Sequence, residues 1–121
     1  MSIQHLLAVL LITTSTTASA SDICKSAHEM IACCQMTIKS FENQLDRKEA
    51  DMSWECWKEM DLAVEQGKYE RWLNICTPEG FNLEKLPYSI VTFLQNNPEF
   101  QTRSPRFVIL RLLEMKWPCK K

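Results

Sequence analysis

Glycine and proline are scarce in this sequence, with two glycines and five prolines among 121 residues. Neither type occurs between Ser21 and Gln66, so this stretch lacks the residues that most often punctuate secondary structure. No segment shows the alternation of apolar and polar residues, bounded by turn signals, that is typical of a β-strand. These absences disfavour a sheet and leave helices as the expected secondary structure.

The sequence also lacks an excess of either charge. Its 14 basic and 15 acidic residues give a formal net charge of −1, and the two signs are interspersed. A nucleic-acid-binding protein would show a basic patch or stripe, and a protein that lies on a membrane surface would show a basic amphipathic helix. The sequence shows neither, so we expect no nucleic-acid partner.

The first twenty residues predict a secretory signal peptide. Leu6–Ile12 is an unbroken apolar run, and Ala18–Ala20 is an A-x-A cleavage site. The run is too short to span a bilayer, which takes about 20 residues. A buried N-terminal helix is the alternative, but the Ser/Thr composition of Thr13–Thr17 disfavours it. We expect cleavage after Ala20 and one mature domain, residues 21–121, with no membrane anchor.

Apolar residues that recur at steps of three and four predict an all-α fold, a compact bundle of four or five helices stapled by disulfides. The first helix is expected within Ile23–Phe41. The polar segment Glu42–Asp51 follows, and we interpret it as a loop or a solvated helix end. Ser53 is expected to cap a second helix, which Gly67 interrupts.

Three further helices are predicted in the rest of the chain. A short one covers Tyr69–Cys76, the next covers Leu86–Asn96 with Pro87 in its first turn, and the last opens with Ser104 and ends before Pro118. The tryptophans and methionines on these helices are interpreted as core residues.

All six cysteines lie in the mature chain, and an even count in a small exported protein predicts disulfides. Cys76 and Cys119 lie at two expected helix ends, and a bridge between them would close a loop of about 44 residues, worth roughly 4 kcal/mol. Cys33 and Cys34 point about 100° apart on a helix, so they need different partners. Cys56 is the natural partner for one of them, and we list Cys34 and Cys56 as disulfide cysteines.

Cys24 leaves two possibilities open. It cannot reach Cys33 within one straight helix, because nine residues rise about 13.5 Å and bridged Cα atoms lie within about 7 Å. Either the first helix begins after Cys24, or this cysteine bonds elsewhere. Cys24, His28 and Cys33 could also suggest a metal site or a Cys–His hydrolase. Their spacing brings only part of the set together on one helix, so we expect no metal, no cofactor and no catalytic residues.

Several motifs follow one another in the C-terminal part of the chain. Cys76–Pro78 forms a C-x-P motif, Leu86–Leu94 has the form Leu-x3-Ile-Val-x-Phe-Leu, and Asn97–Glu99 then precedes an apolar helix that closes with Trp117–Cys119. In their order and spacing, over residues 76 to 119, these motifs resemble the Rap/Tai family of type VI secretion amidase-immunity proteins.

The resemblance implies a function. Such proteins reside in the periplasm of Gram-negative bacteria, are often dimers, and block the substrate cleft of papain-like peptidoglycan amidases that sister cells inject. The resemblance also matches the C-x-P and W-P-C motifs to a Cys76–Cys119 bridge. We therefore expect a periplasmic immunity protein, not an enzyme, with a cognate amidase and a second copy of itself as partners.

Other classes of exported helical protein are alternatives. A periplasmic chaperone or an envelope-stress binding protein would have the same composition. Insect odorant-binding proteins and plant lipid-transfer proteins fit poorly, because Cys33 and Cys34 are adjacent, Cys119 is isolated, and the chain has six cysteines.

The inhibitory surface is expected at a loop, since an inhibitor of a cleft enzyme must protrude and helical bundles protrude at their loops. The segment Glu42–Asp51 is the longest polar stretch, with the loops at 77–82 and 97–103 as rivals. An ordinary solvated helix end is the simpler interpretation of this segment. Its mixed charges suit specific pairing and belong to Asp46, Arg47, Lys48, Glu49 and Asp51.

Overall fold

The computed structural model describes residues 23–120, and these residues form an all-α bundle. The helices are α2 (Ala27–Ser40), α3 (Arg47–Tyr69), α4 (Leu86–Asn96) and α5 (Pro105–Lys116), with three short 3₁₀ turns, η2 (Arg71–Leu73), η3 (Leu83–Lys85) and η4 (Pro98–Phe100). The predicted fold class is therefore confirmed. Within the described range, no helix has both the length and the apolar character needed to cross a membrane. The predicted signal peptide and its cleavage site lie outside the described residues.

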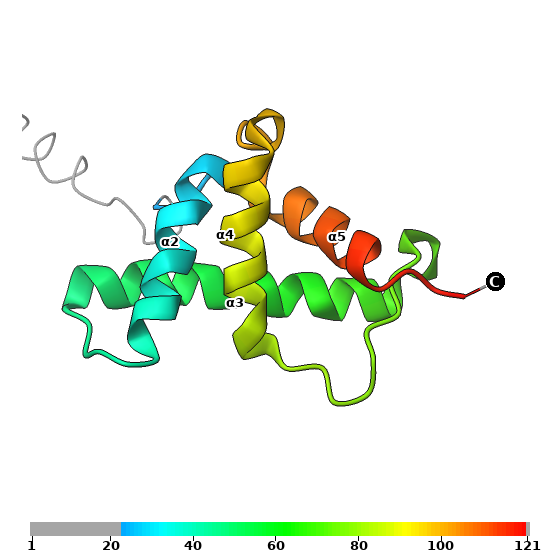
Figure 1. The fold of residues 1–121 in the computed structure, drawn as a ribbon, viewed down its shortest axis with the longest axis horizontal. Coiled ribbons are helices and arrows are strands. Elements are labelled where there is room, and N and C mark those ends of the chain that lie inside the picture. Colours follow the sequence, from blue (N-terminus) through cyan, green and yellow to red (C-terminus); the bar gives the residue numbers. More distant parts are fainter. Residues whose placement is uncertain (1–22, 121) are drawn as a thin grey trace, which may run out of the picture.

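The longest helix, α3, runs the length of the molecule, and the other three helices lie across or along it (Figure 1). α2 packs against both α3 and α4, and α5 packs against α3. The core between them is apolar, and its largest fully buried side chains include Met30, Met60, Ile90, Leu94, Ile109 and Leu113. Each α-helix buries one side in this core, so the opposite side of α3 faces outward along its length.

The last two α-helices begin and end as predicted. α4 covers Leu86–Asn96 with Pro87 in its first turn. α5 begins after Ser104, whose hydroxyl accepts a hydrogen bond from the Phe107 N–H at 3.3 Å. Proline lacks the N–H that the first turn leaves unpaired, so it is tolerated at both starts.

The predicted start of the second helix is wrong, because α3 begins at Arg47 and not after Ser53. Asp46 is its N-cap. The Asp46 carboxylate accepts from the Glu49 N–H at 2.8 Å, and the Glu49 carboxylate accepts from the Asp46 N–H at 3.0 Å. This reciprocal capping box satisfies the backbone N–H groups of Asp46 and Glu49. The helix can therefore begin before the apolar stripe that marks its buried side. Ser53 is instead buried within α3, with its hydroxyl 3.1 Å from that of Thr37 on α2.

Two further predictions near Gly67 are also wrong. α3 continues through Gly67 to Tyr69, because a helix tolerates glycine and Ile75 packs where a side chain would stand. A Cβ at Gly67 would lie 3.2 Å from the Ile75 side chain. The expected helix Tyr69–Cys76 is reduced to the 3₁₀ turn η2, since Asn74 adopts a left-handed conformation (φ 58°) that ends it.

An ion pair between Lys39 and Glu49 joins the end of α2 to the start of α3. The hydrogen bond from Lys39, with a second from the Asp46 N–H, lowers the pKa of Glu49 below its ordinary value. A lowered folded-state pKa stabilises the fold above the unfolded-state pKa, and this contribution is lost as the pH falls through the folded-state pKa.

We therefore expect the substitution Lys39→Ala to raise the pKa of Glu49 toward its ordinary value. An NMR titration of the Glu49 side-chain carboxyl carbon in both proteins would measure the change. The same pKa in the two proteins would show that Lys39 does not hold the carboxylate in solution.

Candidate partner-binding surfaces

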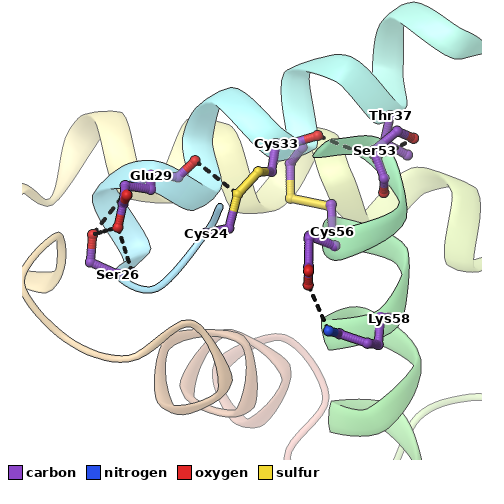
Figure 2. The surroundings of a disulfide bond; sticks show 10 residues. Cys24, Ser26, Glu29, Cys33, Thr37, Ser53, Cys56 and Lys58 are labelled. Carbon is purple, nitrogen blue, oxygen red and sulfur yellow. Dashed lines mark hydrogen bonds and ion pairs between the residues drawn. A yellow bond between two sulfur atoms is a disulfide. The ribbon is translucent and has the colours of Figure 1, made fainter. Parts of the chain in front are cut away.

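The six cysteines form three disulfides, Cys24–Cys33, Cys34–Cys56 and Cys76–Cys119. The predicted bridge between Cys76 and Cys119 is thus confirmed, and of the two adjacent cysteines Cys34 is the one that pairs with Cys56. α2 begins at Ala27, so the segment before it folds back and brings the Cα of Cys24 within 6.7 Å of that of Cys33 (Figure 2). The first of the two possibilities for Cys24 is correct.

The Cys–His pair that the sequence suggested does not assemble as a reactive centre. Cys24 is oxidised to a disulfide, so it carries no thiol at this position. His28 is exposed, and its Nδ1 lies 3.0 Å from the Gln101 side-chain oxygen. Among residues 23–120, no group of three His, Cys, Asp or Glu side chains has a geometry that could hold a metal ion.

The predicted charged segment is divided between two roles. Asp46 and Glu49 hydrogen-bond to each other's backbone in the capping box, and Glu49 also pairs with Lys39. Arg47, Lys48 and Asp51 are exposed on the first turns of α3. Of the predicted segment Glu42–Asp51, residues 42–46 therefore belong to the loop between α2 and α3, and residues 47–51 are the start of α3. The charges of Arg47, Lys48 and Asp51 lie on the surface of the helix.

A short turn at the end of α3 does protrude. We call residues 69–74 the Trp72 turn. Its Tyr69 and Trp72 side chains are 80% and 77% exposed, more than any other large hydrophobic side chain in the described part of the chain. In Figure 1 this turn, in dark green, stands out beyond the end of α3 and close to the C-terminal end. The prediction that the tryptophans and methionines lie in the core is therefore wrong for Trp72, and also for Trp54 and Met115, which are exposed.

The backbone that carries the Trp72 turn is fixed at its base. Ile75 forms a bridge with Pro118, and the Cys76 N–H donates to the Trp117 carbonyl at 2.8 Å. The Cys76–Cys119 disulfide also links the same two chain segments covalently. A surface held in one conformation loses little conformational entropy when it binds, so the turn presents its aromatic side chains in a preorganised form.

A hollow of about 240 Å³ lies beside the Trp72 turn. Its wall combines apolar side chains with an ion pair between Arg111 and Glu114, whose atoms are 2.9 Å apart. It is lined by Gln66, Trp72, Leu73, Phe107, Leu110, Arg111 and Glu114. An apolar site rimmed by charge is typical of protein–protein interfaces.

A second surface covers the outward side of α3. A hollow of about 350 Å³ there is lined by Trp54, Trp57, Lys58, Asp61, Leu62 and Leu83. Trp54 is 62% exposed and Leu62 43% exposed. The apolar surface continues from Trp57 to Phe41 (ring centroids 6.3 Å apart) and on to Tyr88 (6.2 Å). Contiguous exposed apolar patches mark interaction sites.

Comparisons with protein-family models, with curated proteins and with solved structures find no match to this chain. The resemblance to the amidase-immunity proteins is therefore a resemblance of motifs alone. The two surfaces have to be interpreted from their own geometry.

Proposed function

We propose that this chain is a periplasmic immunity protein that binds a peptidoglycan amidase of a type VI secretion system and inhibits it by placing the Trp72 turn in its substrate cleft. The observation that carries the proposal is the exposure of Tyr69 and Trp72 on a base tied by a disulfide. Three disulfides suit an oxidising compartment, and the motifs between residues 76 and 119 supply the choice of partner.

The physical argument concerns how a small bundle blocks a cleft. A cleft accepts a convex element, and the Trp72 turn is convex, rigid and aromatic. Tryptophan, tyrosine and arginine dominate binding energy at interfaces, and Tyr69, Arg71 and Trp72 are all exposed on this turn. The nearby hollow supplies a complementary recess for a side chain of the partner.

A helical chaperone or envelope-stress binding protein is the second candidate, and the Trp54 hollow favours it. That hollow is apolar and open along α3, so it could accept a side chain from an unfolded protein. A chaperone would bind many unfolded chains with similar affinity, whereas an immunity protein discriminates one folded partner.

We expect the substitution Trp72→Ala to weaken binding of the amidase about 30-fold or more, since truncation of a central aromatic residue costs about 2 kcal/mol or more. Binding of the protein at nanomolar concentration to immobilised amidase, together with inhibition of muropeptide cleavage, would measure the loss. Trp54→Ala is the matched control, because it removes a similarly exposed tryptophan from another surface.

The charge reversal Arg47→Glu with Lys48→Glu tests the segment that the sequence had favoured. If that segment entered the cleft, broken charge pairs would cost about 2–5 kcal/mol. Unchanged affinity in Trp72→Ala, with a loss in the charge-reversed protein, would move the inhibitory surface to the start of α3. Circular dichroism would verify that every variant keeps its helical signal.

A further inference from the structure

Two adjoining hollows lie between α4 and α5. One has a volume of about 370 Å³ and the other about 410 Å³, and Ser89 and Lys116 line both of them. We call the pair of hollows the α4–α5 groove. Neither Tyr69 nor Trp72 lines this groove, so a molecule bound in it would leave both side chains of the Trp72 turn exposed.

The charge of the α4–α5 groove has one sign. Lys85 and Lys116 line it, and no aspartate or glutamate does. Neither lysine takes part in an ion pair within residues 23–120. The other two hollows described above each contain both a cation and a carboxylate. In a chain with 14 basic and 15 acidic residues, a groove lined by cations alone attracts an anionic partner.

The polar side chains of the groove form a row along α4. Lys85, Ser89, Thr92 and Asn96 follow one another at steps of four, three and four, so they share one side of the helix. The row is about 16 Å long, which is the length of about five residues of extended chain. Within the described part of the protein, the side chains of Ser89, Thr92 and Asn96 have no hydrogen-bond partner, so their polar groups are available to a ligand.

We infer that the α4–α5 groove binds a short, extended and acidic peptide segment of another protein. Hydroxyl and side-chain amide groups both donate and accept hydrogen bonds. The row on α4 can therefore pair with the N–H and C=O groups that alternate along a peptide backbone. Lys85 and Lys116 hold the carboxylates of the peptide through charge-assisted hydrogen bonds.

The lining of the groove favours an acidic peptide over other partners. Arginine is the residue that recognises phosphate with two parallel hydrogen bonds, and no arginine lines the groove. An amphipathic helix would need a continuous apolar groove, whereas hydroxyl, amide and ammonium groups run the length of this one. The partner that fits is therefore hydrophilic, extended and anionic.

The end of the groove near Lys85 is held in one shape. The Phe81 ring meets the Trp117 ring edge-on, with their centroids 5.0 Å apart. The Trp117 carbonyl in turn accepts a hydrogen bond from the Cys76 N–H at 2.8 Å. A wall that is already ordered loses little conformational entropy on binding. The loop at 77–82, which the proposed inhibitory function does not use, thus forms part of a preorganised site.

An NMR titration of the isotope-labelled mature protein, with its disulfides intact and no amidase present, would test the inference. The probe is a capped pentapeptide with two glutamates among serines and glycines, and the control peptide has glutamines in their place. We expect saturable binding of the glutamate peptide with a dissociation constant of about 1 mM or lower. The amide shifts should change at Ser89, Thr92 and Lys116, and the glutamine peptide should bind about tenfold more weakly or less.

Substitutions on the groove assign the binding to its side chains. Lys85→Glu with Lys116→Glu should weaken binding of the glutamate peptide about tenfold or more, because like charges then face one another. Both lysines are exposed, so this protein should keep its helical signal. Arg47→Glu with Lys48→Glu is the matched control, since it changes the net charge equally but should weaken binding by no more than about twofold at screened distances. Thr92→Val removes only a hydroxyl group and should weaken binding about threefold.

Several results would overturn the inference. They are no saturation up to about 10 mM peptide, equal affinity for the glutamine peptide, and equal losses in the two charge-reversed proteins. A carboxylated oligosaccharide such as oligogalacturonate that binds more tightly than the glutamate peptide would also contradict it, because the groove would then be a glycan site. Since no amidase is present, each of these results leaves the proposed inhibitory function unaffected.

Discussion

Replacing both Cys34 and Cys56 with alanine is expected to lower the free energy of unfolding by about 2–5 kcal/mol, which is the usual cost of removing a native disulfide from a small exported domain. Both cysteines are fully buried, and their bridge joins α2 to α3. Removing the bridge raises the conformational entropy of the unfolded chain and also leaves a gap between the two helices. Urea denaturation followed by circular dichroism would measure the change.

The order in which the disulfides are reduced provides the control. Cys76 is exposed and Cys119 half-buried, whereas Cys34 and Cys56 are inaccessible. Because a thiolate must reach the sulfur that it attacks, a reductant under native conditions should open Cys76–Cys119 first and Cys34–Cys56 only when the chain unfolds. Trapping of free thiols and peptide mapping would establish the order. Loss of the buried bridge first, or a stability loss below about 1 kcal/mol in the double variant, would contradict the expected role.

The helix boundaries that could be predicted are those set by local signals. Proline and a serine cap mark the starts of α4 and α5, and the chemistry behind both signals acts within a few residues. The start of α3 has an equally local signal, since Asp46 and Glu49 have the spacing of a capping box. The apolar stripe begins only later, at Trp54, because the first turns of α3 extend beyond the core.

The Trp72 turn could not be predicted in the same way. Periodicity identifies which apolar residues share a face, but burial depends on whether another element covers that face. Trp72, Leu73 and Cys76 follow Tyr69 at helical spacing. Asn74 nevertheless turns the chain, and Ile75 pairs with Pro118, 43 residues later. That long-range bridge decides the exposure of Trp72, and a single sequence does not reveal it.

The outward side of α3 lies between these two cases. Met60 and Ala63 mark the inner side of the helix, so apolar residues at Trp54, Leu62 and Tyr69 leave a second apolar row on the opposite side. Contiguous exposed apolar residues on a helix mark an interaction site. The sequence therefore contains a signal for a second interface, and only the structure shows which of the two sides the rest of the chain covers.

Leu113→Ala is expected to destabilise the monomer by about 2–5 kcal/mol, the range for truncating a leucine in a packed core. Leu113 is fully buried on α5. Alanine there would lose the apolar burial of the side chain and leave a cavity that the disulfide-tied helices cannot easily close. Leu62→Ala removes the same atoms from a side chain that is 43% exposed, so it should change the stability of the monomer by only about 0.5 kcal/mol.

Burial separates the two leucines in this matched pair of substitutions, because Leu113 lies in the core and Leu62 on the outward side of α3. Urea denaturation followed by circular dichroism would measure both changes in the free energy of unfolding. A Leu113→Ala cost near that of Leu62→Ala would show that α5 does not form the core that the buried side chains indicate.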